Sequence, residues 1–266
     1  MKKILFFILT LALTLTLAAC GKKDNKTTDL VKDSDWKTPG MLIDEYQKDD
    51  KEVSTVRLTI AFKDDDGISY KGYMTFLLFN DVAPISVNNF VKLTEKGFYD
   101  NLTITRIVTT DLIQGGDPEK TTLSEKKDNQ NTIKGEFEEN EVFNNLSHRR
   151  GVISMARAED YDSASSQFFV VKNTFTSADG NYAGFGWLLE EKKEVNGSYV
   201  SYSMSERTNT KDEDGVRILY DYDLLDAICK LQVVNDQNDG APVTTVEIVK
   251  AEVIDKNAKI STIKYI

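Results

Sequence analysis

Alternating apolar and polar residues predict short strands along most of the chain from residue 53 to residue 254. The segments VSTVRLTIAF (53–62) and ISYKGYMTFLLF (68–79) both alternate, and DDDG (64–67) between them predicts a hairpin turn. The other strand-like runs are 102–108, 111–114, 151–156, 167–171, 184–189 and 243–254. Because a sheet that closes on itself leaves no unpaired edge, this pattern favours a closed antiparallel eight-stranded β-barrel.

Two segments have helical rather than strand periodicity. The segment 86–97 repeats its apolar residues at helical spacing, and it starts with a plausible N-cap, Ser86, and stops at Gly97. The segment 221–232 places four apolar residues on one helical face: Leu224, Leu225, Ile228 and Leu231. The sequence therefore predicts a mainly β fold in which two α-helices cap the barrel.

Changes in composition divide the chain into four parts. We expect a signal peptide at 1–19, a lipidated cysteine with a polar tether at 20–50, a folded domain at 51–256 and a C-terminal tail at 257–266. Within the domain, residues 190–216 are polar and have the character of an insertion. Their inner part alternates, so an extended hairpin or flap and a disordered loop are both open.

The first twenty residues, MKKILFFILTLALTLTLAAC, have the order of a secretory signal. Lys2 and Lys3 precede an apolar run that is short for a membrane span, and two alanines then precede Cys20. The ending LAAC resembles a bacterial lipobox, which implies that Cys20 is acylated and anchors the protein at the outer face of the cell membrane. The alternative is an ordinary signal peptide and a soluble secreted protein.

The charge of the chain is acidic and argues against some partners. Loss of Lys2 and Lys3 with the signal would take the formal charge from −10 to −12. An acidic surface disfavours nucleic acid and anionic lipid, so we expect no nucleic-acid partner and a membrane contact through the lipid anchor alone.

The supply of cysteine and histidine limits the chemistry that the chain can perform. If Cys20 is acylated, Cys229 is the only remaining thiol, and we expect it to be a buried helix residue without a disulfide. One histidine, His148, and one thiol cannot form a Cys/His zinc site, and no GxSxG nucleophile motif is present. The acidic turn 64–67 lacks the ligand spacing of an EF-hand. We therefore expect neither a metal nor a cofactor, and a hydrolase has no supporting constellation.

Four blocks, in register between residues 53 and 254, resemble the cyclophilin family of peptidyl-prolyl cis-trans isomerases. They are APISVNNFVKLTEKGFYDNLT, LIQGGDP, SHRRGVISMARAEDYDSASSQFFVV, and DGNYAGFGWLLE followed by LLDAI. The resemblance implies a cyclophilin-like barrel and rotation about X-Pro bonds. It also implies that the partners are proline-containing unfolded or extended polypeptides.

The resemblance also assigns roles to individual residues. Arg106 in TITRIV matches the catalytic arginine, which donates toward the prolyl nitrogen and so weakens amide resonance. Gln114 in IQGGD matches the glutamine that bonds the substrate backbone. The residues that match the proline pocket and the peptide-binding strand are Phe169, Leu112, Met155, Ala156, Arg157, Asp111 and Tyr182.

Several positions depart from the pattern of the family. Thr105 stands where histidine is usual, and Asp111 replaces an aromatic wall of the proline pocket, within possible reach of Arg106. Ser177 and Ala178 replace larger residues, whereas Tyr182 still offers a ring face and a hydroxyl. His148 matches a family histidine outside the immediate pocket, for which packing or hydrogen bonding under the site is the favoured role.

Two functions remain open from the sequence. The first is a peptidyl-prolyl isomerase that assists folding of exported proteins outside the membrane, and Thr105, Asp111 and Ser177 are the positions expected to limit its activity. The second is a catalytically weak or inactive peptide-binding module on the same scaffold, because a fold does not by itself fix an activity. Nothing in the sequence requires an oligomer, so we expect a monomer.

Overall fold

A computed structural model describes residues 30–119, 131–190, 192–196, 198–201, 210–234 and 239–263. The predicted signal peptide and Cys20 lie outside the described residues.

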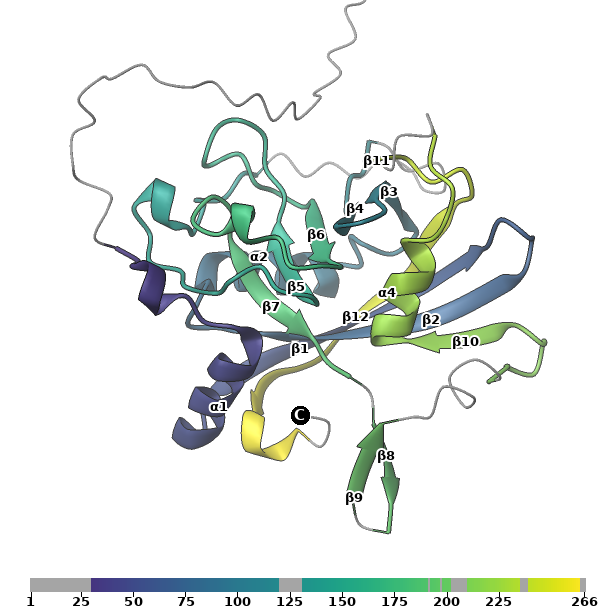
Figure 1. The fold of residues 1–266 in the computed structure, drawn as a ribbon, viewed down its shortest axis with the longest axis horizontal. Helices are drawn as coiled ribbons and strands as arrows, with labels where there is room; N and C mark the ends of the chain where they lie inside the picture. The colour runs from purple at the N-terminus through teal and green to yellow at the C-terminus, as the bar shows by residue number, and fades with distance from the viewer. Residues whose placement is uncertain are drawn as a thin grey trace, which may run out of the picture.

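Eight strands form a closed ring in which every neighbouring pair is antiparallel (Figure 1). The order around the ring is β1 (Glu52–Lys63), β12 (Val246–Lys259), β3 (Leu102–Val108), β4 (Leu112–Gly115), β6 (Phe168–Val171), β5 (Val152–Met155), β7 (Gly184–Leu188) and β2 (Ser69–Leu78). The ring closes because β1 pairs with β12 on one edge and with β2 on the other. The predicted mainly β fold with a closed eight-stranded antiparallel sheet is confirmed.

Four short strands lie outside this ring. β10 (Arg217–Tyr220) pairs with β2 in parallel, and β11 (Asp239–Gly240) pairs with β3. The sequence patterns did not predict either of them. In the expected insertion, β8 (Lys192–Val195) and β9 (Ser198–Ser201) form a separate two-stranded hairpin, which projects from the ring in Figure 1. Of the two alternatives for 190–216, the described residues there favour the hairpin.

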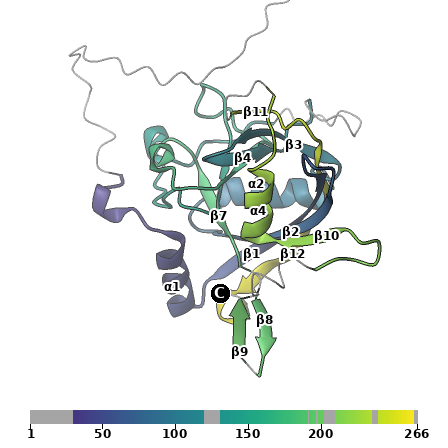
Figure 2. The same ribbon diagram turned by 45° about the vertical axis from the view of Figure 1, so that its right-hand side comes forward.

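Two of the three described helices lie at the ring, α2 (Pro84–Glu95) and α4 (Asp221–Ile228). In Figure 2 the ring is seen nearly end-on, with α4 in front and α2 behind. The predicted N-cap of the first helix is wrong, because Ser86 lies inside α2. Glu136 takes the capping role: its carboxylate accepts the N–H groups of Ile85 and Ser86 at 2.9 and 2.8 Å. Gly97 follows the helix with φ of +63°, as expected of a C-terminal stop.

The last part of the expected polar tether is folded in the structure. A short 3-10 turn, η1 (Asp33–Asp35), precedes α1 (Pro39–Asp49), which buries Leu42, Ile43 and Tyr46 against the outside of the ring. This helix has few apolar residues, so its stability comes from docking rather than from its own periodicity.

The chain just before α1 contacts the loop that leads to His148. The N–H of Lys37 donates to the carbonyl of Asn145 at 2.8 Å, and the N–H of Ser147 donates to the carbonyl of Lys37 at 2.9 Å. This segment therefore supports the loop 145–148.

The described part of the expected C-terminal tail, 257–263, also belongs to the fold. β12 continues to Lys259, and a 3-10 turn, η4 (Ile260–Thr262), follows it. Ile260 is fully buried in the apolar cluster that includes the buried face of α1. The chain that follows the predicted domain end at 256 therefore packs against the helix that precedes β1.

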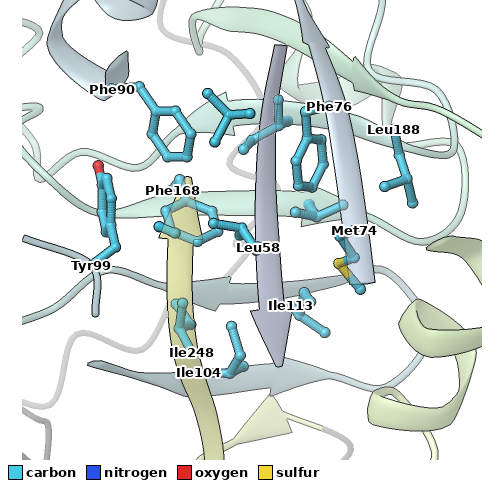
Figure 3. Close-up of a cluster of buried hydrophobic side chains, with 14 of the residues drawn as sticks. Leu58, Met74, Phe76, Phe90, Tyr99, Ile104, Ile113, Phe168, Leu188 and Ile248 are labelled. Carbon is cyan, nitrogen blue, oxygen red and sulfur yellow. The ribbon is translucent and has the colours of Figure 1, made fainter. Parts of the chain in front are cut away.

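The main core fills the inside of the ring (Figure 3). Phe90 from α2 meets Tyr99, Phe168 and Phe185 at ring-centroid distances of 4.9, 5.5 and 5.3 Å. Leu58 contributes from β1, and it is 1% exposed. Two further 3-10 turns, η2 (Glu138–Asn140) and η3 (Thr176–Ala178), lie in the loops outside this core. The core holds the strands that carry the candidate site in a fixed register.

Three further findings concern membrane-spanning helices, metal sites and the thiol. Across the described part of the chain, none of the helices is long and apolar enough to cross a membrane. The same residues contain no cluster of three or more His, Cys, Asp or Glu side chains suited to a metal ion. Cys229 is buried and has no disulfide, as expected, and burial raises the pKa of its thiol to about 12.

Candidate functional site

Four adjacent strands of the ring, β3, β4, β6 and β5, each contribute one side chain to a row that runs from strand to strand. Arg106 of β3 lies opposite Gln114 of β4, Gln114 lies opposite Phe169 of β6, and Phe169 lies opposite Ser154 of β5. Directly opposed residues share a face of the sheet, so all four side chains point to the same side. The register thus brings together Arg106, Gln114 and Phe169, which lie up to 63 positions apart in the sequence.

The polar end of this row is a chain of hydrogen-bonding groups. Arg106 Nη1 lies 3.5 Å from Gln114 Oε1, at the long end of a hydrogen bond. Gln114 Nε2 donates to Gln167 Oε1 at 2.9 Å, which fixes the orientation of the amide. The carbonyl oxygen of Gln114 therefore faces the guanidinium.

The apolar end of the row is built around Phe169. Its ring is 4% exposed and packs in one cluster with Leu112, Ala156 and Tyr182. The edge of Phe169 meets the ring of Tyr182 at 5.6 Å and 89°. A small apolar ring, such as that of proline, would find an aromatic floor here and a phenol wall beside it.

His148 lies beneath this floor. Its ring stacks on Phe169 at 5.8 Å, its Nδ1 lies 2.9 Å from Asp179 Oδ1, and its Nε2 lies 3.0 Å from Ser154 Oγ. Burial opposes ionisation of Asp179, but hydrogen bonds from the His148 side chain and backbone and from Ser147 outweigh it and lower the Asp179 pKa. His148 is fully buried, so the structure agrees with the predicted packing and hydrogen-bonding role.

Arg157 closes the other side of Tyr182. Its guanidinium lies 4.8 Å from the centroid of the Tyr182 ring, and 5.1 and 5.0 Å from those of Phe137 and Tyr161. Arg157 Nε donates to the carbonyl of Asn181 at 3.0 Å. Arg157 therefore holds the wall of the pocket by cation–π contacts.

The two other residues of the predicted peptide-binding strand are placed differently from one another. The Met155 side chain is 1% exposed and lies in the main core, and its N–H donates to Ala183 at 3.1 Å. Ala156 lies against the Phe169 cluster, and its N–H donates to Gln167 at 2.9 Å. Met155 therefore supports the pocket from inside the core, and its side chain does not line the pocket.

The anticipated pairing of Asp111 with Arg106 does not occur. The Asp111 carboxylate accepts the hydroxyl of Thr110 at 2.8 Å. Arg106 is instead paired with Asp239 of β11, whose carboxylate accepts Arg106 Nε at 2.7 Å and Nη2 at 2.6 Å. This hydrogen bond raises the pKa of Arg106, although partial burial acts in the opposite direction.

The remaining departures from the family pattern lie at the edge of the site. Thr105 is half-buried, Ser177 is exposed in η3, and Ala178 is buried. Sequence reasoning missed Asp239, Gln167 and the two partners of His148, Asp179 and Ser154. Only the Asp-Gly pair before the last strand could have drawn attention to Asp239.

A cavity of about 430 Å³ lies elsewhere, between the acidic turn after β1 and α4. Its lining includes Phe62, Tyr70, Asp65 and Arg217, and none of the predicted site residues. The candidate site is therefore the row of side chains that runs from half-buried Arg106 to buried Phe169, and not this cavity.

The residues in the row combine two chemical capacities. A permanently charged guanidinium and an oriented amide can bind amide oxygen or nitrogen, and an aromatic floor a short distance away can bind an apolar ring. The row does contain a serine paired with a histidine, Ser154 with His148 Nε2, but both side chains are fully buried behind Phe169 and out of reach of a bound peptide. The arrangement suits binding and electrostatic stabilisation of a peptide rather than covalent chemistry.

Comparisons with known proteins point to one family. The chain matches the family model "Cyclophilin type peptidyl-prolyl cis-trans isomerase/CLD" over residues 60–219, which is more than half of its length. It is 37% identical over 124 residues to a peptidyl-prolyl cis-trans isomerase of Acinetobacter baylyi, covering 45% of this chain and 62% of that protein. It is 36% identical over 130 residues to a Staphylococcus haemolyticus protein that carries the same name provisionally, covering 48% and 59%.

The chain thus spans less than two thirds of the length of these relatives. Among solved structures, a cyclophilin-type isomerase of Cryptosporidium parvum is 21% identical with a TM-score of 0.49, covering 76% of this chain and 97% of that one. By the family match, the chain belongs to the cyclophilin-type peptidyl-prolyl cis-trans isomerase family.

Proposed function

We propose that the protein is a peptidyl-prolyl cis-trans isomerase that acts on X-Pro bonds of unfolded or extended polypeptides. The observation that carries this proposal is the row of Arg106, Gln114 and Phe169, in which a cation and an oriented amide stand beside an aromatic floor. Rotation about the bond has a barrier of roughly 18–20 kcal/mol because resonance gives the C–N bond double-bond character.

The side chains of the row lower this rotation barrier without forming a covalent bond to the peptide. Phe169 and Tyr182 hold the proline ring, so the peptide is fixed on one side of the rotating bond. The guanidinium of Arg106 donates toward the prolyl nitrogen, which favours its pyramidal form and weakens resonance. Gln114 binds the backbone near the guanidinium. Each of these contacts accelerates the reaction only as far as it is stronger in the twisted state than in the planar one.

The test is the exchange rate of an X-Pro tetrapeptide with and without the protein, measured by two-dimensional exchange NMR. We expect the wild-type chain to accelerate exchange, and Arg106→Ala to reduce the acceleration by about 100-fold or more, as for loss of a principal electrostatic donor. Equal exchange rates with and without wild-type protein would refute the enzyme. If the peptide still bound under those conditions, the chain would be the peptide-binding module instead.

We further propose that Cys20 is acylated and holds the protein at the outer face of the cell membrane, where it assists folding of exported proteins. The order of charge, apolar run, two alanines and cysteine in residues 1–20 supports this placement. Metabolic labelling with a palmitate analogue in a bacterial host should label the wild type and not Cys20→Ala. Equal labelling of both would contradict the anchor.

A further inference from the structure

Asp239 holds the guanidinium of Arg106 along one edge only. Its two carboxylate oxygens accept Nε and Nη2, which is the side-on, two-point geometry of a charge-assisted pair. Nη1 lies on the other side of the group and faces Gln114 Oε1. Two hydrogen bonds to one planar carboxylate fix both the position and the plane of the guanidinium, and they leave the Nη1 edge toward the row.

The backbone delivers this carboxylate to Arg106. β11 is paired with β3, with Asp239 opposite Val108 and Gly240 opposite Ile107. The pairing places Asp239 next to the strand that carries Arg106, although the two residues are 133 positions apart.

Backbone hydrogen bonds join the described residues before Asp239 to those after it. The N–H of Val234 donates to the carbonyl of Ala241 at 2.8 Å, and the N–H of Val243 donates to the carbonyl of Gln232 at 2.8 Å. A Cβ on Gly240 would lie 2.6 Å from the carbonyl oxygen of Val234, so a larger residue would displace the strand. The position of Asp239 is therefore set by strand pairing and by a close backbone approach.

We propose that Asp239 is the positioning residue for Arg106, and that it sets the orientation of the guanidinium that the X-Pro bond meets. This inference rests on the proposed isomerase function. An unheld arginine samples many rotamers, and a donor displaced by about 1 Å from the reacting atom can cost about 100-fold in rate. The carboxylate does not touch the substrate in this role. It acts through Arg106, and the Nη1 edge stays available.

The proposal is tested with the full chain and the variants Asp239→Asn and Asp239→Ala. Asparagine keeps the size of the side chain but offers one acceptor oxygen and no charge. We expect Asp239→Asn to lower kcat by about 10-fold and Asp239→Ala by more, while KM changes less than about twofold, because the pocket around Phe169 is untouched. Unchanged or increased kcat in both variants would overturn the proposal, and an increase would mean that Asp239 blocks Arg106.

A matched control is Asp226→Asn. Asp226 also forms a two-point pair with an arginine, end-on rather than side-on: it accepts Nη1 and Nη2 of Arg150 at 3.0 and 2.9 Å, and it lies on α4 outside the row. We expect this variant to retain wild-type kcat. An equal fall in kcat in Asp226→Asn would show a general structural effect and would overturn the specific role of Asp239.

A second readout separates this proposal from the proposed function. In ¹H–¹⁵N spectra of arginine side chains, the Nε–H signal of Arg106 should be sharp and slow to exchange in the wild type, because Asp239 accepts it. It should broaden in Asp239→Asn, with the Arg150 signal unchanged. Absence of this difference would overturn the positioning role even in an active protein. If the wild type did not accelerate exchange, the proposed function would fail. The NMR difference would then decide alone whether Asp239 orders Arg106.

Discussion

Replacing Tyr46 with phenylalanine should stabilise the protein, although the change removes only one oxygen atom. Tyr46 lies in α1, is 1% exposed, and packs its ring edge against Phe79 at 5.2 Å. Its hydroxyl is buried and has no hydrogen-bond partner among the described residues. A hydroxyl that is buried without a hydrogen-bond partner loses its hydration, and this loss destabilises the folded state.

The expected magnitudes follow from these contacts. A buried, unpaired hydroxyl costs about 1–3 kcal/mol, so Tyr46→Phe should raise the free energy of unfolding by about 1 kcal/mol after the small void is allowed for. For a fold of this size, that corresponds to a rise in Tm of about 2–4 °C. Tyr46→Ala also removes the hydroxyl but loses the ring, and a buried aromatic truncated to alanine costs about 3–5 kcal/mol. Its net effect should be a loss of about 2–4 kcal/mol.

Urea unfolding followed by tryptophan fluorescence measures both variants on one scale. Tyr99→Phe is a matched control with the opposite sign: Tyr99 is also fully buried, but its hydroxyl donates to the carbonyl of Ser166 at 3.0 Å. We expect that change to lower stability by about 1 kcal/mol. If Tyr46→Phe lowered stability as much as Tyr99→Phe, the Tyr46 hydroxyl would have a partner and the reasoning would be wrong. If Tyr46→Ala had no effect, α1 would not be docked.

Two further predictions concern the site. The pKa of Asp179 is lowered in the fold, so its contribution to stability is present above the unfolded value near 3.8 and is lost as the pH falls through the folded pKa. Wild-type Tm should therefore fall more steeply below about pH 4 than that of Asp179→Asn, and parallel pH profiles would contradict the assignment. Asp111→Phe should restore an apolar wall near Leu112 and raise kcat/KM on a proline tetrapeptide by about 5-fold, equivalent to roughly 1 kcal/mol of ring burial. A lower kcat/KM in a folded variant would show that Asp111 does not limit the pocket.

Periodicity located the longer ring strands, because a strand with one buried face alternates. β5 and β6 are buried at every position and were found as short apolar runs instead. The expected run 102–108 coincides with β3, and 167–171 differs from β6 by one residue. Periodicity failed where the chain is stabilised by docking. The helix α1 has only three buried large apolar side chains. No local sequence pattern predicts the pairing of β10 with β2. These elements depend on surfaces that exist only after the ring has formed.

The site residues likewise divide into those that sequence motifs predicted and those that depend on the completed fold. Arg106, Gln114 and Phe169 were identifiable because they lie within ordered motifs whose spacing the strand register preserves. Asp239 was not, because its role depends on the pairing of a two-residue strand with β3, and its neighbours are polar. Asp111 is a related case. The resemblance to the family placed it at the proline pocket, within reach of the guanidinium, but its carboxylate binds Thr110 and Arg106 binds Asp239.

The closure of the ring through β1 also constrains the order in which the protein can be completed during synthesis. Thr55 of β1 donates its hydroxyl to the carbonyl of Asp255 in β12, 200 positions later in the chain. β1 can therefore pair with β2 as soon as both strands are available, but its other edge stays open until β12 is available. Contacts of such separation slow folding, because the long loop must be closed before the pairing is gained. An open edge on the first strand is a place where two nascent chains could pair with each other. For this protein, aggregation should be most sensitive to conditions during the interval before β12 arrives.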